Sequence, residues 1–204
     1  MKKTLLIYFL SDYEDSVLNL YVSVKKLGLL DSKNIYSLII FQSIKLNGIE
    51  EIIDLFDQKY NLNCYSDLYG YFSALKIINI DDFEYFIFMN SSCIGPILPS
   101  YNKKFNWESI FTNDLENCGM ISPIIEFPPY EDKNVSDIKL SSKLSNLFNL
   151  KTIPFAHSYC LSLNKKALFC LIDNNSFPTK DINRDLAVGH FERTITAVLL
   201  NEGF

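Results

Sequence analysis

The sequence predicts an α/β protein with a mainly parallel central sheet and helices on both faces. Three continuous apolar runs of strand length, residues 4–10, 35–41 and 83–89, are typical of strands that are buried on both sides. The segments between them carry apolar residues at helical spacing, so strands and helices alternate through the first half of the chain. Such an alternation is the pattern of parallel strands joined by crossover helices. An all-β or all-helical fold does not fit it.

The first half also contains the connecting helices and one short strand. The expected elements, in order, are a helix capped at Ser11-Asp12 and ended by Gly28, a helix over 48–60, a short strand around Leu62 and a helix over 68–78. Gly70 lowers the helix propensity of the last of these segments.

The second half is less regular. The expected elements are a short helix over 106–115, a strand over 119–127 interrupted by Pro123, a loop over 128–139, a strand over 157–164, a helix over 165–172 and a C-terminal helix from Arg184. We find no internal repeat and no low-complexity segment. A chain of 204 residues is therefore expected to form a single domain, residues 1–204.

Composition narrows the class of protein. The apolar fraction of 48% and the charged fraction of 21% are typical of globular proteins. A net charge of −5, without clustered Lys and Arg, argues against nonspecific nucleic-acid binding. The five cysteines are odd in number and contain no Cys-x-x-Cys pair, so neither a disulfide framework nor a thiolate zinc site is indicated. No apolar stretch reaches the ~20 residues of a membrane span. These features predict a cytoplasmic protein without a transmembrane segment.

Three small polar residues end the third apolar run abruptly. Asn90, Ser91 and Ser92 follow residues 83–89 directly. In parallel sheets, ligands bind outside the carboxyl ends of the strands, so these side chains are candidates for ligand contact. The alternative is an ordinary turn at a strand end, in which the polar side chains cap their own backbone.

Several familiar catalytic and cofactor motifs are missing. The chain has no Gly-x-Gly-x-x-Gly after a strand, no phosphate-binding loop ending in Gly-Lys-Ser/Thr and no Gly-x-Ser-x-Gly elbow. His157 and His190 have no acidic cluster near them in the sequence, which makes a poor metal motif. Trp107, the only tryptophan, is expected in the core.

Six short segments occur in an order that is typical of one family. They are "CYSDLYGYFSAL" (64–75), "YFIFMNSSCIGPILPSY" (85–101), "WESIF" (107–111), "GMISPII" (119–125), "PFAHSYCLSLNKKAL" (154–168) and "FERTITAVLLNEGF" (191–204). In this order they resemble the small GT-A-type glycosyltransferases of bacterial surface polysaccharide synthesis and of large DNA viruses. The chain is similar to the glycosyltransferase domain of a chlorella virus and to rhamnan-synthesis proteins. The resemblance spans nearly the whole chain and implies a GT-A-like fold.

The resemblance also implies how a donor would be bound. Asn90, Ser91 and Ser92 fall where most GT-A enzymes carry Asp-x-Asp, the motif that binds a divalent ion on the donor pyrophosphate. Here an amide and two hydroxyls replace the carboxylates that a hard cation prefers. Any Mn²⁺ or Mg²⁺ is therefore expected to be held mainly by the donor's own phosphates.

Other residues receive roles from the same resemblance. Asp67 is placed beside the nucleotide base or ribose, and His157, with Ser158, near the donor phosphates, which makes His157 a candidate metal ligand. Glu192 is the candidate catalytic base, and Asp185 is a competing acid. Each has a structural alternative, because Asp67 and Asp185 can be helix caps and a lone histidine is commonly a structural residue.

Two functional classes follow from these observations. The first is a glycosyltransferase that moves a sugar from a nucleotide-diphosphate sugar to a glycan or polysaccharide acceptor. The second is a non-catalytic carbohydrate- or nucleotide-sugar-binding module on the same fold, which the missing Asp-x-Asp keeps open. A response-regulator-like signalling domain fits the first half but does not account for residues 105–204. The sequence leaves open the sugar, the base, the acceptor, the stereochemistry and the oligomeric state.

Overall fold

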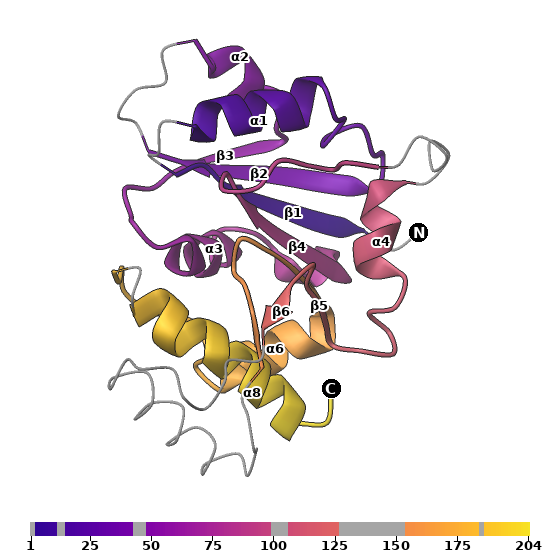
Figure 1. Cartoon of the computed structure of the whole chain (residues 1–204), viewed down its shortest axis with the longest axis vertical. Helices are drawn as coiled ribbons and strands as arrows, with labels where there is room; N and C mark the ends of the chain where they lie inside the picture. The colour runs from indigo at the N-terminus through magenta and orange to yellow at the C-terminus, as the bar shows by residue number, and fades with distance from the viewer. Residues whose placement is uncertain (1–2, 12–14, 43–47, 99–105, 127–153, 184–185) are drawn as a thin grey trace.

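The computed structural model describes residues 3–11, 15–42, 48–98, 106–126, 154–183 and 186–204. A six-stranded sheet with the order β3-β2-β1-β4-β8-β5 lies at its centre (Figure 1). The strands are β1 (Thr4–Phe9), β2 (Ile35–Phe41), β3 (Gln58–Asn61), β4 (Tyr85–Asn90), β5 (Met120–Ile121) and β8 (Cys160–Asn164). Two further strands, β6 (Ile125–Glu126) and β7 (Phe155–Ala156), form an antiparallel pair of their own.

The strand directions confirm a mainly parallel sheet. Strand β1 pairs in parallel with both β2 and β4, and β2 pairs in parallel with β3. Strand β8 runs antiparallel to β4 and to β5. From β1 the chain adds β2 and β3 on one side, and it then returns to place β4 on the other. The carboxyl ends of β1 and β4, where Phe9 pairs with Asn90, are therefore the point at which the strand order reverses. Open α/β sheets bind ligands at this point.

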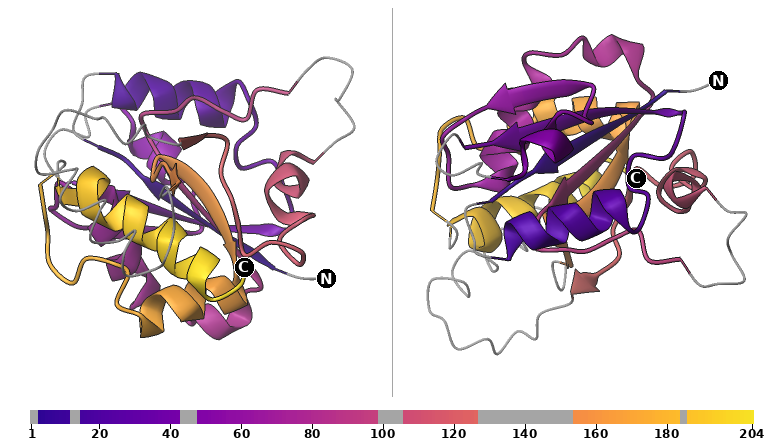
Figure 2. Two further views of the ribbon diagram at one scale, coloured as in Figure 1. Left: turned by 60° about the horizontal axis from the view of Figure 1, so that its bottom comes forward. Right: turned by 90° about the horizontal axis from the view of Figure 1, so that it is seen from above.

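Helices cover both faces of the sheet, as the sequence predicts. They are α1 (Ser16–Lys25), α2 (Glu50–Ile53), α3 (Asp67–Leu75), α4 (Trp107–Thr112), α6 (Lys165–Asp173) and α8 (Arg193–Asn201), with a 3₁₀ turn η1 (Ile80–Asp82) and a π-helical segment η3 (Ala187–Glu192). Helices α1 and α2 lie on one side of the sheet, and α3, α6 and α8 lie on the other (Figure 1). The left view of Figure 2 shows the same separation of α1 from α6 and α8.

Strand β1 shows why its sequence is apolar without interruption. Leu5, Ile7 and Phe9 belong to the core beneath α3, α6 and α8. The alternate residues Leu6 and Tyr8 belong to the second core, beneath α1 and α2. Successive side chains of a strand point to opposite faces, so a strand between two cores needs apolar residues at every position.

The second predicted helix, over 48–60, is wrong in its last part. Helix α2 ends at Ile53, and residues 58–61 form β3. The carboxylate of Asp57 accepts hydrogen bonds from the backbone N–H and the hydroxyl of Ser37, at 2.7 and 2.9 Å. These bonds place the residues after Asp57 along the edge of β2. The backbone hydrogen bonds between β2 and β3 then favour a strand there, although the side-chain pattern favours a helix. The short strand predicted around Leu62 accordingly lies a few residues earlier.

Other boundaries also differ from the sequence-based expectation. The strand predicted over 157–164 begins only at Cys160, and residues 157–159 form a turn. The strand over 119–127 splits into β5 and β6 on either side of Pro123, which has no N–H for a ladder bond. The first helix begins at Ser16 instead of at Ser11, and its expected cap Asp12 lies outside the described residues.

Two sequence features have a direct structural explanation. Gly70 lies where α3 crosses β1, and a Cβ atom there would lie 2.7 Å from Cδ2 of Phe9, so only glycine allows this approach. Trp107 is 6% exposed and packs in the core with α1, which confirms the expectation for it.

All five cysteines are free. Within the described part of the chain, no helix has the length and apolar character needed to cross a membrane.

Candidate active site

A pocket of about 190 Å³ lies at the carboxyl ends of β1 and β4. Its walls come from these two strand ends, the start of α3, the turn between β7 and β8, and η3. Six of the residues singled out in the sequence line it: Asp67, Asn90, Ser92, His157, Ser158 and Glu192. The fold therefore brings together side chains that are up to 125 positions apart in the sequence (192 − 67).

Asp67 is the centre of a hydrogen-bond network at the start of α3. Its Oδ1 accepts from the backbone N–H of Leu68 at 2.8 Å. Its Oδ2 accepts from Nδ2 of Asn90 at 2.7 Å and from the hydroxyl of Ser158 at 2.9 Å. Burial raises the pKa of this carboxyl above its ordinary value, although the three hydrogen bonds act in the opposite direction. The helix itself is capped by Ser66, whose hydroxyl accepts from the N–H of Tyr69.

The polar residues after β4 divide between two roles. Asn90 uses its amide group on Asp67, and its Oδ1 accepts from the backbone N–H of Ser92 at 2.9 Å. This second bond closes a self-capping turn at the strand end, which was the alternative to ligand contact for residues 90–92. Ser92 is exposed at the pocket. Ser91 is 1% exposed and turns away, because its hydroxyl accepts from the N–H of Ser11 at 2.9 Å.

Glu192 is a buried acid with one unsatisfied oxygen. Its side chain is 3% exposed, and Oε1 accepts from the backbone N–H of Ser158 at 2.7 Å. Among the described residues Oε2 has no hydrogen-bond partner, and it lies 3.9 Å from Nδ1 of His157. Burial raises the pKa of Glu192; the charge of Asp67 also raises it, whereas the bonds from Ser158 and the nearby His157 act to lower it. A buried carboxylate oxygen without a donor is rare and calls for an explanation.

The two acids are linked through Ser158. Its hydroxyl contacts Asp67 and its backbone N–H contacts Glu192, so one residue in the turn before β8 positions both carboxylates. His157 precedes it, and its ring stacks on Tyr159 with centroids 5.2 Å apart. The expected position of His157 at the start of a strand is wrong; its place in a turn is what lets it face the pocket beside Glu192.

Some candidate residues lie elsewhere. Asp185, the competing acid, lies outside the described residues. His190 is in η3 with Glu192 but does not line the pocket; its ring packs edge-on against Phe191 at 4.8 Å. The separation of His190 and Glu192 follows from their spacing, since helical positions two apart do not share a face.

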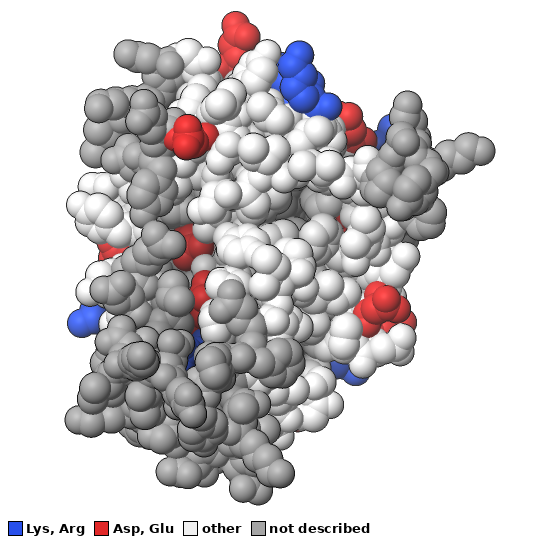
Figure 3. Space-filling model, viewed as in Figure 1, with Lys and Arg blue, Asp and Glu red and all other residues white. Residues whose placement is uncertain are grey.

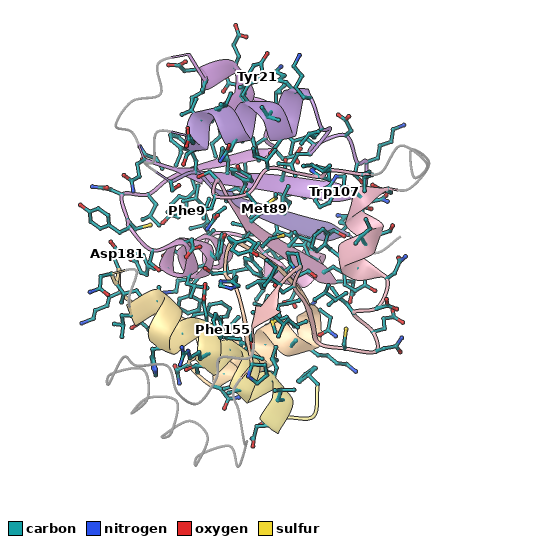
Figure 4. The ribbon with its side chains drawn as sticks, viewed as in Figure 1. Phe9, Tyr21, Met89, Trp107, Phe155 and Asp181 are labelled. Atoms are coloured by element: carbon teal, nitrogen blue, oxygen red, sulfur yellow. The ribbon has the colours of Figure 1, made fainter. Side chains whose placement is uncertain are left out.

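Sequence reasoning missed Asp181 and Tyr65. The two carboxylate oxygens of Asp181 accept from the backbone N–H groups of Tyr65 and Ser66, at 3.0–3.1 Å. These bonds hold the segment before α3, and with it Asp67, against the segment before η3; Figure 4 labels Asp181 at the edge of the molecule. Tyr65 is 88% exposed at the pocket. Neither residue belongs to a periodic pattern, so no local signal marks it.

The donor atoms of the pocket do not fit a resident metal ion. Both oxygens of Asp67 already accept hydrogen bonds, and Oε2 of Glu192 is the carboxylate oxygen that remains. Among the described residues, no group of three or more His, Cys, Asp or Glu side chains is placed to hold an ion. Hard cations such as Mg²⁺ bind through carboxylates completed by waters and substrate phosphates, and the described pocket leaves too few carboxylate oxygens to hold such an ion without a phosphate.

Comparison with known proteins gives a distant structural likeness. No protein-family model matches the chain, and no curated protein matches it. Among solved structures, a mannosyltransferase from Pyrobaculum calidifontis in complex with GDP-Man and Mn²⁺ superimposes with a TM-score of 0.47 and 9% sequence identity. The match covers 88% of this chain and 48% of the other, so the chain spans about half the length of that protein. A likeness this distant bears on neither the reaction nor the substrate of this chain.

Proposed function

We propose that this protein is a sugar-nucleotide-dependent glycosyltransferase and that residues 1–204 form one GT-A-like domain. One observation carries the proposal. At the point where the strand order reverses, a pocket holds a buried acid, Glu192, with one oxygen that has no hydrogen-bond partner among the described residues and lies 3.9 Å from Nδ1 of His157. The resemblance of six sequence segments to small GT-A-type glycosyltransferases supports the same reaction.

Glu192 is suited to accept a proton from an acceptor hydroxyl. Because burial raises its pKa, its carboxylate is a stronger base than an exposed glutamate and is closer in pKa to a neutral working pH. The bond from the N–H of Ser158 fixes Oε1, which leaves Oε2 as the atom that would take the proton. Deprotonation of the hydroxyl oxygen would then accompany its attack on the anomeric carbon of the donor, while the bond from that carbon to the diphosphate oxygen breaks and the nucleoside diphosphate leaves with the electron pair.

Asp67 and Ser92 are suited to bind the donor. Asp67 can accept a hydrogen bond from a ribose or sugar hydroxyl at the lone pairs that its present partners leave, and the exposed hydroxyl of Ser92 can donate to or accept from the donor. Two carboxylates in one small pocket repel an anionic diphosphate. We therefore propose that any Mn²⁺ or Mg²⁺ arrives with the donor phosphates and is held mainly by them.

The test is a thermal-shift panel of UDP-, GDP-, dTDP- and CMP-sugars, with and without Mn²⁺. A ligand at 100 times its Kd stabilises the folded state by ~2.7 kcal/mol, which raises the Tm of a chain of this size by about 5–10 °C. We expect one nucleotide class to give such a shift and its sugar to be released or transferred on incubation. The proposal is wrong if no member of the panel shifts the Tm.

A non-catalytic binding module is the second candidate. The lack of an acidic cluster that could hold a divalent ion, among the described residues, favours it. The two functions differ in one measurement. A binding module would give the thermal shift with no consumption of the nucleotide sugar, both for the wild type and for Glu192→Gln. A transferase would consume the donor, and Glu192→Gln would bind it but stop its consumption.

A further inference from the structure

A second, larger cavity lies on the other side of the loop that follows β4. It has a volume of about 370 Å³ and is bounded by the end of β4, the segment 93–98, α4 and the start of β8. Met89 of β4 and Trp107 of α4 are two of its walls, and both are labelled in Figure 4. The described residues that line it include no charged side chain. Nothing in the proposed transfer reaction accounts for this cavity.

The rim of the cavity is apolar and open to solvent. Ile94, Ile97 and Ile110 line it and are 44%, 72% and 52% exposed. Single exposed apolar residues are common, but several around one cavity indicate a surface that is covered by a ligand. The middle of the face drawn in Figure 3, between its charged groups, is almost entirely white, which marks it as free of Lys, Arg, Asp and Glu.

The chemistry of the walls selects a hydrocarbon chain as the occupant. A peptide or a sugar placed in this cavity would bring amide or hydroxyl groups, each of which loses free energy when it is buried without a hydrogen-bond partner. Isoleucine, leucine, proline and methionine side chains make up most of the walls and offer no such partner; the indole N–H of Trp107, which has no hydrogen-bond partner among the described residues, is a polar exception. An alkyl or isoprenoid chain has no polar group to satisfy, and its burial is favourable in proportion to the area removed from water.

The cavity adjoins the candidate active site at one residue. Tyr159 lines both the apolar cavity and the pocket that contains Glu192, and its ring stacks on His157. A chain seated in the cavity would therefore have its head group beside Tyr159, next to the proposed base. This arrangement is what an acceptor with a polar head and an apolar tail requires.

We propose that the cavity binds the hydrocarbon tail of a lipid-linked or alkyl-linked acceptor, and that Ile97 and Ile110 contact this tail. The assignment of the ligand as an acceptor rests on the proposed transferase function. The binding of a hydrocarbon chain does not, so the two can fail separately.

The test is isothermal calorimetry with methyl, butyl, hexyl and octyl β-D-glucoside, each below its critical micelle concentration and without nucleotide. Burial of one CH₂ group raises the affinity by up to about fourfold. We expect no detectable binding of the methyl glucoside and a stepwise gain in affinity from butyl to octyl. Equal affinities across the series would overturn the proposal.

Substitutions at the rim locate the binding site. Ile110→Asn and Ile97→Asn each place an amide on the cavity wall at a solvent-exposed position, so folding is retained. We expect either to weaken octyl glucoside at least about fivefold, the scale of losing one to two buried methylenes. Leu55→Asn, at a 48% exposed residue outside the cavity, is the matched control and should bind as the wild type does. Unchanged affinity in both rim variants would show adventitious binding elsewhere and overturn the assignment.

The outcome also separates this inference from the proposed function. If octyl glucoside binds at the rim residues but no nucleotide sugar shifts the Tm, the hydrocarbon site stands and the transferase proposal fails. If nucleotide sugars bind and the alkyl series shows no dependence on chain length, the transferase proposal stands and the hydrocarbon site fails.

Discussion

Replacing Ser158 by alanine removes one of the three hydrogen bonds that Asp67 accepts, and its effect on stability should depend on pH. The hydroxyl of Ser158 lies 2.9 Å from Oδ2 of Asp67, and the residue is 7% exposed. A hydrogen bond to a charged group contributes about 1.5–3 kcal/mol. We therefore expect a loss of about 2 kcal/mol when Asp67 is ionised, which lowers the Tm of a chain of this size by about 4–8 °C.

The sign of the pH dependence follows from the pKa of Asp67. Burial holds this pKa above its ordinary 3.8, and the bond from Ser158 is one of the causes that lower it. In Ser158→Ala the pKa rises further, so the variant resists ionisation more than the wild type does. The stability difference should be smallest below about pH 4, where the carboxyl is protonated in both proteins, and should grow as the pH rises through the pKa of folded Asp67.

Denaturant unfolding between pH 4 and pH 8 measures this difference. Ser162→Ala is the matched control, because the hydroxyl of this buried serine donates to the carbonyl oxygens of Phe111 and Ile121, which do not titrate. The control should lose about 1 kcal/mol at every pH. The reasoning is refuted if the Ser158→Ala loss is the same at all pH values, or if it shrinks as the pH rises.

Three further predictions concern the same site. Glu192→Gln should abolish sugar transfer, which donor consumption measures. It should be as stable as the wild type at neutral pH, and its stability relative to the wild type should rise with pH, because burial disfavours the charged form of Glu192; denaturant unfolding measures this difference. Gly70→Ala should lower the Tm, because overpacking against Phe9 costs ~1–3 kcal/mol and exceeds a helix-propensity gain of about 1 kcal/mol. It should also weaken nucleotide binding, because Phe9 is a wall of the pocket. Nucleotide binding measured by calorimetry should survive EDTA in part, since the pocket offers few ligands for a resident ion.

Each of these predictions has a clear contrary result. Glu202→Gln, at an exposed glutamate in the C-terminal segment, is the control for Glu192→Gln and should leave transfer unchanged. A more stable Gly70→Ala variant would contradict the close approach of α3 to β1. A tight metal site in the free protein that is lost in Asn90→Ala or Ser92→Ala would contradict the proposed binding of any ion through the donor.

The amino-acid pattern alone determined the architecture of the sheet. Residues 4–10, 35–41 and 83–89 are apolar at nearly every position, with Thr4, Ser37 and Glu84 as exceptions, because the strands are buried on both faces, and this local signal does not depend on the rest of the fold. The position of Asn90 at the carboxyl end of a strand follows from the same reading. Its place beside Phe9 at the end of β1 comes from the strand order, which the structure supplies.

Only the tertiary structure decided how the site is assembled. The sequence favours a helix through residues 58–60, but the bonds between Asp57 and Ser37 and the edge of β2 make this segment a strand. Ser158 joins Asp67 to Glu192 across 91 and 34 positions, and Asp181 holds the backbone of Tyr65 across 116. Contacts over such separations leave no periodic trace in the chain, because they depend on the path of the loops, which packing of the sheet and helices determines.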